Sequence, residues 1–266
     1  MLRVLVARRG PTDTRPMSEQ PRRLYEQIAL KVASDIASGK YALGQRLPSE
    51  RELAQVFGVS RPTVREAIIA LELDGLVEVR VGSGVYVTHQ KPPTGKVGAK
   101  DIGPFELLEA RRVIEGEACA MAALRITDDE LQKLNDLLAE MRTDNQHNEI
   151  LMSEEADRQF HEIIALATQN TAIYASVQML WDSRTRSPQT HMVDDLVRAH
   201  GVKPPIAEHA AIVRALKRRD PDAARSAMHK HISRVIERLL EHTEVKEMQR
   251  VRETAAEKRR WYSSVR

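Results

Sequence analysis

Residues 45–88 read QRLPSERELAQVFGVSRPTVREAIIALELDGLVEVRVGSGVYVT. Two short amphipathic stretches in this segment meet at Gly58, and the two β-rich runs that follow meet at Gly82-Ser83-Gly84. Glycine is favoured at both places because helix ends and tight hairpin turns need backbone conformations that other residues adopt poorly. The order of helix, turn, helix and hairpin predicts a winged helix-turn-helix with a β-hairpin wing.

Local capping signals set the limits of these helices. Apolar residues recur at helical spacing over 21–38, which predicts a first helix there. Ser49 and Glu52 have the spacing of a capping box, in which each side chain bonds the other residue's backbone N–H. Ser60 is the expected N-cap of the next helix, over 61–74.

The composition indicates a largely helical globular protein. Its 266 residues are 42% hydrophobic, 30% charged and 4% aromatic, and a chain of this length can bury two cores. The sequence contains no apolar run of 18 residues, so no membrane partner is expected. The opening MLRVLVARRG is too short and too charged for a signal peptide. A single cysteine, Cys119, excludes an intrachain disulfide, and a reducing cytoplasmic location is expected.

Charge is distributed unevenly along the chain. Residues 1–100 hold 16 Lys and Arg against 10 Asp and Glu, a net charge of +6, whereas the remaining residues carry −3. The N-terminal part is therefore the part suited to a polyanion such as DNA.

The whole chain is predicted to be mainly α, with two domains. The expected divisions are a flexible leader over 1–20 with Met17 as an alternative start to Met1, the winged helix-turn-helix domain over 21–88, a Pro-, Gly- and Lys-rich linker over 89–103, an all-α bundle over 104–244, and a charged tail over 245–266. Helices of the bundle are expected over 104–125, 127–144, 149–168, 170–186, 205–218 and 221–244.

The helix over 61–74 has the features of a recognition helix. Arginine suits guanine because its planar guanidinium meets O6 and N7 together, and a helix fits the major groove. We expect Arg61, Thr63 and Arg65 to face the duplex from the first turns, and Arg51 on the preceding helix to hold a phosphate. The alternative is that these arginines only solvate a helix surface.

The segment LPSERELAQVFGVSRPTVREAIIALELDGLVEVRVGSGVYV resembles the DNA-binding domain of the GntR family of bacterial transcription regulators. The resemblance implies that Arg51, Arg61, Thr63, Arg65 and Gly82 contact operator DNA. At the wing tip Val81 stands where some relatives have a polar residue, so Arg80 is expected to make the contact there. Ser60 joins this set at the start of the recognition helix.

Four residues of the second domain could hold a metal ion. Asp157 and His161 are four apart on a predicted helix and therefore share a face, while His209 and His231 lie on two later helices. One carboxylate and three imidazoles suit Zn²⁺, Ni²⁺ or Mn²⁺. With nine histidines in the chain, chance spacing of surface or core histidines is the alternative.

The second domain is similar to the FCD sensor domain of the FadR-like subfamily. That resemblance implies a divalent metal, Zn²⁺ first, held by Asp157, His161, His209 and His231. It also implies that Arg111 faces an effector cavity. GPFELLEARRVIE, DRQFHEIIALATQN and the W-x-x-R-x-x-x-P stretch are most similar to hexuronate-responsive repressors. A sugar acid could chelate the ion while Arg111 and Arg184 pair with its charge.

These features predict a ligand-responsive regulator, expected from family habit to be a repressor, that binds a palindromic operator in double-stranded DNA as a homodimer. Dimerisation is expected because one recognition helix reads too few base pairs. The alternatives are a regulator that responds to another small hydroxy acid, a metal-dependent hydrolase and an architectural DNA-binding protein. The hydrolase is disfavoured because the HEIIA run ends in Ala165, where the zincin motif needs a second histidine.

Overall fold

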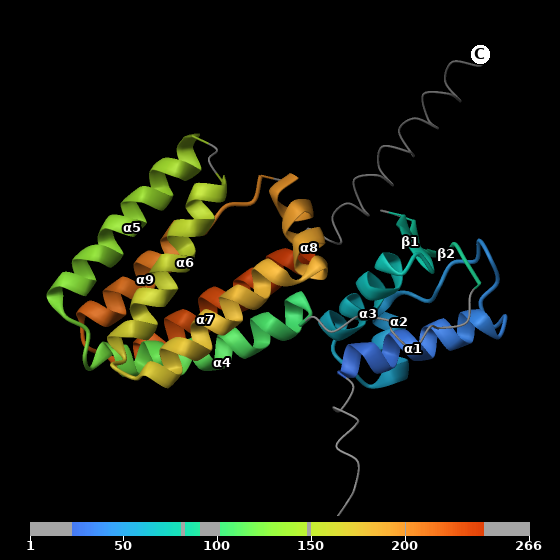
Figure 1. The fold of residues 1–266 in the computed structure, drawn as a ribbon, viewed down its shortest axis with the longest axis horizontal. Helices are drawn as coiled ribbons and strands as arrows, with labels where there is room; N and C mark the ends of the chain where they lie inside the picture. Colours follow the sequence, from blue (N-terminus) through green and yellow to red (C-terminus); the bar gives the residue numbers. More distant parts are fainter. Residues whose placement is uncertain (1–22, 81–82, 91–101, 148–149, 200, 242–266) are drawn as a thin grey trace, which may run out of the picture.

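The computed structural model describes residues 23–80, 83–90, 102–147, 150–199 and 201–241. Its N-terminal domain is a winged helix-turn-helix (Figure 1), built from α1 (Leu24–Ala37), α2 (Glu50–Phe57), α3 (Arg61–Leu73), β1 (Val77–Arg80) and β2 (Gly84–Val87). The predicted leader, wing-tip Gly82, most of the linker and the tail lie outside the described residues.

The predicted caps of the helix-turn-helix are present. The backbone N–H of Ser49 donates to Glu52 Oε2 at 2.7 Å, and the backbone N–H of Glu52 donates to Ser49 Oγ at 3.3 Å. Gly58 ends α2 in the left-handed conformation, with φ of 66°. Ser60 Oγ then accepts the backbone N–H of Thr63 and opens α3. The turn between the two helices is thus determined by local residues.

The wing is an antiparallel hairpin extended by a third segment. β1 and β2 pair with Val77 opposite Val87 and Arg80 opposite Gly84. The backbone N–H of Leu47 donates to the carbonyl of Val85 at 2.8 Å, so residues before α2 cover the free edge of β2. This covering protects an edge strand that would otherwise offer unpaired backbone groups.

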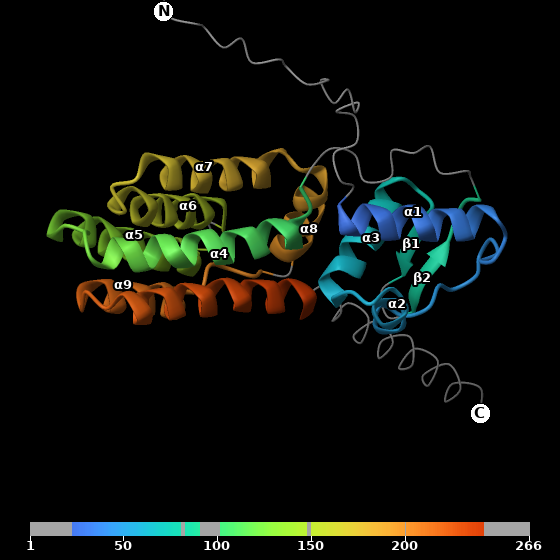
Figure 2. The same cartoon turned by 90° about the horizontal axis from the view of Figure 1, so that it is seen from below.

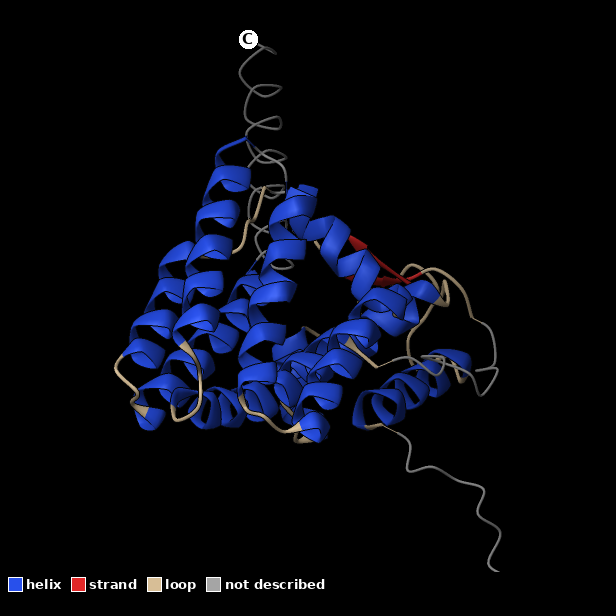
Figure 3. Cartoon of the chain, turned by 60° about the vertical axis from the view of Figure 1, so that its left-hand side comes forward, coloured by secondary structure: helices blue, strands red, loops and turns tan. Residues whose placement is uncertain are grey.

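The C-terminal domain is a bundle made only of helices. They are α4 (Pro104–Ala123), α5 (Asp128–His147), α6 (Ile150–Ala167), α7 (Thr171–Arg186), α8 (Pro188–Ala199), α9 (Ile206–Lys217) and a last helix that is described over 221–241. Figure 3 shows that strands occur only in the other domain. Among the described helices, none is both long and apolar enough to cross a membrane.

Helix α8 is the element that the sequence analysis missed. Its amphipathic pattern is pronounced, with Met192, Val193, Leu196 and Val197 at helical spacing, so the periodicity of the segment could have predicted it. Signals for its start were also present, since Pro188 occupies the first helical turn and Ser187 Oγ accepts the backbone N–H of Thr190 at 3.3 Å. In Figure 2, α8 stands at the end of the bundle that faces α3.

Each domain has its own core, and one residue of α3 belongs to the core of the other domain. The N-terminal core gathers Val64, Ile68 and Leu71 of α3 with residues of α1 and the wing. Ile69, on another face of α3, belongs instead to the core of the bundle, together with Phe105 of α4. The recognition helix therefore packs directly against the sensor domain.

Candidate functional site

The first turn of α3 presents polar groups at its N-terminus. Arg61 is exposed, as is Arg51 on α2. Ser60 Oγ and Thr63 Oγ1 lie 2.7 Å apart and bond each other. A helix N-terminus with exposed cations is a favourable place for a phosphate, because its backbone N–H groups and its dipole also attract negative charge.

Arg65 does not lie where the sequence predicted. Its side chain is only 7% exposed, and its Nε lies 2.9 Å from Glu50 Oε1 of α2. The expectation that Arg65 is presented to solvent is wrong, because a buried guanidinium is stable only beside an acceptor and Glu50 provides one. In this arrangement Arg65 ties the two helices of the motif together.

The wing carries two exposed arginines. Arg80 Nε pairs with Glu78 Oε2 at 2.9 Å, and its guanidinium lies 4.6 Å from the centre of the Tyr86 ring. Arg46, on the segment that covers β2, was missed in the sequence analysis. Its side chain lies against Gly84, which has a φ of 116°, and any Cβ at that glycine would collide with it.

Asp157, His161, His209 and His231 are brought together from α6, α9 and the last helix. One ligand atom from each lies within 4.8 Å of the others. His209 Nε2 is 2.6 Å and His161 Nε2 is 3.8 Å from Asp157 Oδ1. The three imidazoles are at most 3% exposed. Within the described part of the chain, Asp157 Oδ1 and the Nε2 atoms of His161 and His209 make no hydrogen bond of normal geometry. Buried polar atoms that converge without partners fit a divalent cation.

The other ring nitrogen of each histidine faces an acceptor. His161 Nδ1 contacts Glu115 Oε2 of α4. His209 Nδ1 lies 2.9 Å from the carbonyl of Pro205, and His231 Nδ1 lies 3.2 Å from Glu208 Oε2. Acceptors at Nδ1 favour the tautomer that leaves the Nε2 lone pair for a metal, the usual arrangement around metal-binding histidines.

The charges around the cluster favour ionised carboxylates and at least one neutral imidazole. Burial by itself would raise the pKa of Asp157, but His209 and the other two imidazoles lower it below its ordinary range. Burial opposes ionisation of Glu115 too, yet Arg111 and His161 lower its pKa to about 2. Burial lowers the pKa of His231 to about 4, so this ring is neutral at pH 7.

A pocket opens beside the cluster, with about 910 Å³ of empty space, part of it open to solvent. Asp157 and His231 line one part of it, and the residues of α8 line another. Arg111 of α4 also lines it. The Arg111 guanidinium lies 3.9 Å from the Trp181 ring centre, and its Nε lies 2.6 Å from Glu115 Oε1. A pocket that contains a few converging polar groups is typical of small-ligand sites.

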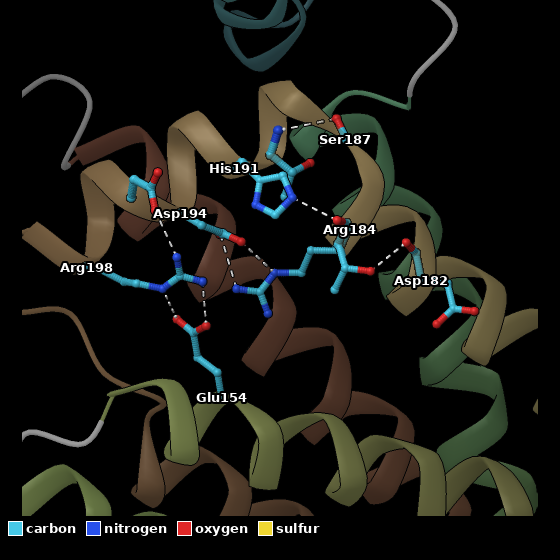
Figure 4. Close-up of polar contacts among 10 residues, drawn as sticks. Glu154, Asp182, Arg184, Ser187, His191, Asp194 and Arg198 are labelled. Carbon is cyan, nitrogen blue, oxygen red and sulfur yellow. Dashed lines mark hydrogen bonds and ion pairs between the residues drawn. The ribbon is translucent and has the colours of Figure 1, made fainter.

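Arg184 lines the same pocket but is already paired. Its Nε and Nη2 donate to Asp194 Oδ2 and Oδ1 at 3.1 and 3.2 Å (Figure 4). Burial alone would lower the pKa of Arg184, but the Asp194 carboxylate raises it, so the guanidinium stays charged. The predicted role of Arg184 in neutralising an effector is therefore weakened, because Asp194 already balances its charge. The sequence analysis missed Asp194 together with the rest of α8.

The junction between the domains is a buried carboxyl group. Glu66 of α3 is 2% exposed, and its Oε1 accepts the backbone N–H groups of Phe105 and Glu106 at 2.7 Å each. Gly103, the N-cap of α4, has no side chain to do this, and a Cβ there would collide with Glu66. The recognition helix thus caps the first helix of the sensor domain.

Comparisons with known proteins agree with this architecture. Residues 24–87 match the family described as bacterial regulatory proteins, gntR family, and residues 106–234 match the FCD domain. The Exu regulon transcriptional regulator of Escherichia coli (strain K12) is 38% identical over 218 residues, which cover 80% of this chain and 83% of that protein. The chain belongs to the GntR family. As a member it is a DNA-binding transcription regulator with an FCD domain, not an enzyme, so the hydrolase alternative is set aside.

Other relatives match most of this chain. The Uxu operon transcriptional regulator of Escherichia coli (strain K12) is 36% identical, with 84% of this chain and 89% of that protein covered. The solved structure of Streptococcus agalactiae GntR is 29% identical, covers 79% of this chain and 98% of that chain, and has a TM-score of 0.41.

Proposed function

We propose that this GntR regulator is a repressor that binds a palindromic operator as a homodimer in the cytoplasm and is released by a small carboxylate effector, a hexuronate or a related sugar acid. In this proposal residues 21–88 bind DNA, 89–103 link the domains, and 104–244 hold the effector and the dimer contacts. The observation that supports it is the convergence of four side chains that could hold a metal ion, beside a pocket whose wall includes α4, the helix held by Glu66 of α3.

The donor set favours Zn²⁺, with Ni²⁺ or Mn²⁺ also compatible. Asp157 and neutral His161, His209 and His231 would leave a divalent ion with a net charge of +1 and with open positions. Arg111 and Glu115 balance each other, as do Arg184 and Asp194. The ion and Lys203, which also lines the pocket, would therefore attract an anionic ligand, and a carboxylate with an adjacent hydroxyl suits a hard cation. The relatives named as Exu and Uxu regulators support a hexuronate.

DNA contact is assigned to exposed groups on α3 and the wing. Arg61 and Thr63 at the start of α3 are the proposed base and phosphate contacts, and Arg51 and Arg80 are the proposed phosphate contacts. Ser60 positions Thr63. Arg65 is proposed to act indirectly, by pairing with Glu50 of α2. A DNA contact by Gly82 is proposed from the family resemblance.

The connection between effector and DNA runs through α4. Its residues Pro104, Leu107 and Arg111 line the pocket, while its first backbone N–H groups are held by Glu66 of the recognition helix. A ligand that shifts α4 must move this cap or break it. Because an effector acts only by its different affinity for two conformations, a shift at α4 is a physical route to misplaced recognition helices.

A binding experiment tests the proposal. Untagged protein is assayed for bound metal, and its melting temperature is then measured with D-galacturonate, D-glucuronate, an aldonate and lactate, with and without chelator. We expect about one zinc per chain and a rise in melting temperature with a hexuronate that chelation abolishes. A hexuronate that gives no shift, or the same shift without metal, contradicts the proposed effector site.

A further inference from the structure

We propose that Thr190 and Asp194 of α8 recognise the hydroxyl groups of the effector, so that the regulator selects a polyhydroxylated acid over a short one. This inference rests on the proposed function and specifies which part of the pocket binds which part of the ligand. The two residues are four apart on one helix and therefore share a face, and both line the pocket that contains Asp157 and His231.

Thr190 has a hydroxyl group that the fold does not use. The residue is 3% exposed, and its Oγ1 makes no hydrogen bond within the part of the chain that the structure describes. Buried hydroxyl groups are normally bonded, because burial without a partner removes the hydrogen bonds that water would supply. A hydroxyl group can both donate and accept, so a ligand hydroxyl is a suitable partner.

Asp194 offers hydrogen-bond acceptors on the same face of α8 as Thr190. Its two oxygens each take one N–H from Arg184, and a carboxylate has about four lone-pair sites, so each oxygen keeps capacity for a second donor. The Arg184 guanidinium has further N–H groups. A sugar hydroxyl, which donates one hydrogen bond and accepts others, matches a neighbouring carboxylate and guanidinium.

The distribution of charge in the pocket predicts how the ligand is oriented. The Arg184–Asp194 pair is neutral as a whole, so it gives little attraction to a carboxylate. Arg111 is likewise paired, with Glu115, so the attraction to a carboxylate comes from the cluster of Asp157 and histidines once it holds a cation. The acid group is therefore expected at the cluster and the hydroxyl groups at α8, and a two-carbon acid would leave the α8 end empty.

Ion pairs attach α8 to two neighbouring helices before any ligand binds. Arg198 Nε and Nη2 donate to Glu154 Oε1 and Oε2 of α6 at 3.2 and 2.9 Å, while the Arg184–Asp194 pair ties α8 to α7 (Figure 4). Groups fixed before binding lose less entropy when a ligand arrives, which makes their hydrogen bonds selective.

The test compares two acids on matched variants. Zinc-loaded full-length protein is titrated calorimetrically with D-galacturonate and with glycolate, using wild type, Thr190→Val, Thr190→Ser and Asp194→Asn. Thr185→Val, on an exposed threonine of α7, is the control. We expect Thr190→Val to weaken galacturonate binding about 3- to 10-fold, the usual effect of one hydrogen bond, and to leave glycolate within about twofold. Thr190→Ser should restore most of the loss, and Asp194→Asn should weaken galacturonate more.

The outcomes separate the two proposals. Equal weakening of both acids by Thr190→Val means that the residue supports the fold, which overturns the inference. Wild type that binds galacturonate with an affinity unchanged in both α8 variants also overturns it, while the proposed effector class stands. Wild type that binds glycolate but not galacturonate overturns the hexuronate proposal and the inference with it.

Discussion

The two domains present their functional residues in opposite ways. The candidate DNA contacts Arg51, Arg61 and Arg80 are exposed and come from one short segment of the sequence. Asp157 and His231 of the candidate metal cluster are far apart in the sequence, on different helices, and meet inside the bundle. An exposed arginine can contact DNA if it lies on the correct face of a helix. A buried cluster forms only when several helices pack in the correct positions relative to one another. A single substitution should therefore remove one contact in the first domain and the whole site in the second.

The largest expected effect is the loss of metal from the sensor domain. His161→Ala removes one of four ligands and leaves Glu115 without the imidazole that faces it. Loss of an outer partner alone typically costs 10- to 100-fold in metal affinity, so loss of a ligand should cost at least about 100-fold. Metal analysis and a zinc titration measure the loss of metal affinity. Operator binding without effector should persist, and its disappearance would show that the two domains are not separable in this way.

Arg65→Ala should damage the DNA-binding domain more than Arg61→Ala does. Removing Arg65 takes away the guanidinium that faces the Glu50 carboxylate, whose side chain is 12% exposed, and breaking a buried pair costs about 3–5 kcal/mol. Arg61→Ala should leave stability within about 0.5 kcal/mol, because the side chain is exposed. Its operator affinity should fall by about 1–3 kcal/mol, as for a lost base contact.

Chemical denaturation and a gel-shift titration distinguish the two arginines. Equal stability of the two variants would contradict the buried position of Arg65. If Arg61→Ala keeps full operator affinity, Arg61 has no reading role.

Glu66 tests how the domains are connected. Burial is the main cause that raises its pKa to about 8, from an ordinary value of 4.5. Because the folded state binds the proton more tightly, its contribution to stability is complete below about pH 4.5 and is lost as pH rises through about 8. Glu66→Gln keeps an oxygen for the N–H groups of Phe105 and Glu106 but cannot titrate.

The free energy of unfolding of wild type, relative to Glu66→Gln, should therefore fall between pH 4.5 and 8. Glu66→Ala, which removes the cap, should destabilise the junction by about 1 kcal/mol and weaken release of the operator by hexuronate. Parallel pH profiles for wild type and Glu66→Gln, or unchanged release in Glu66→Ala, would remove Glu66 from this role.

The smallest expected effect concerns the wing. Arg80 is about half exposed and pairs with Glu78, so Arg80→Ala should reduce operator affinity only a few-fold. The reduction should be similar for all sequences, and the dependence of binding on salt should become less steep, as for one lost phosphate contact. A change in sequence preference instead would indicate that Arg80 reads bases.

Local signals in the sequence predicted much of this molecule. The capping box at Ser49, the Gly58 turn and the α3 helix follow from neighbouring residues, so their positions agree with the structure within a residue or two. The spacing of Asp157 and His161 placed both on one helix face, His209 and His231 were added from two later helices, and the family resemblance supported the set of four. The structure brings all four together.

Only the tertiary structure decided which of these groups are buried and what faces them. The burial of Arg65 depends on Glu50 of another helix, and the balance of Arg184 depends on Asp194 of α8, a partner that helical spacing along the chain does not indicate. Glu66 reaches the first turn of α4 across the domain boundary. Patterns along a chain report which face of an element is apolar, but the partner of a buried charge is chosen by packing between distant elements.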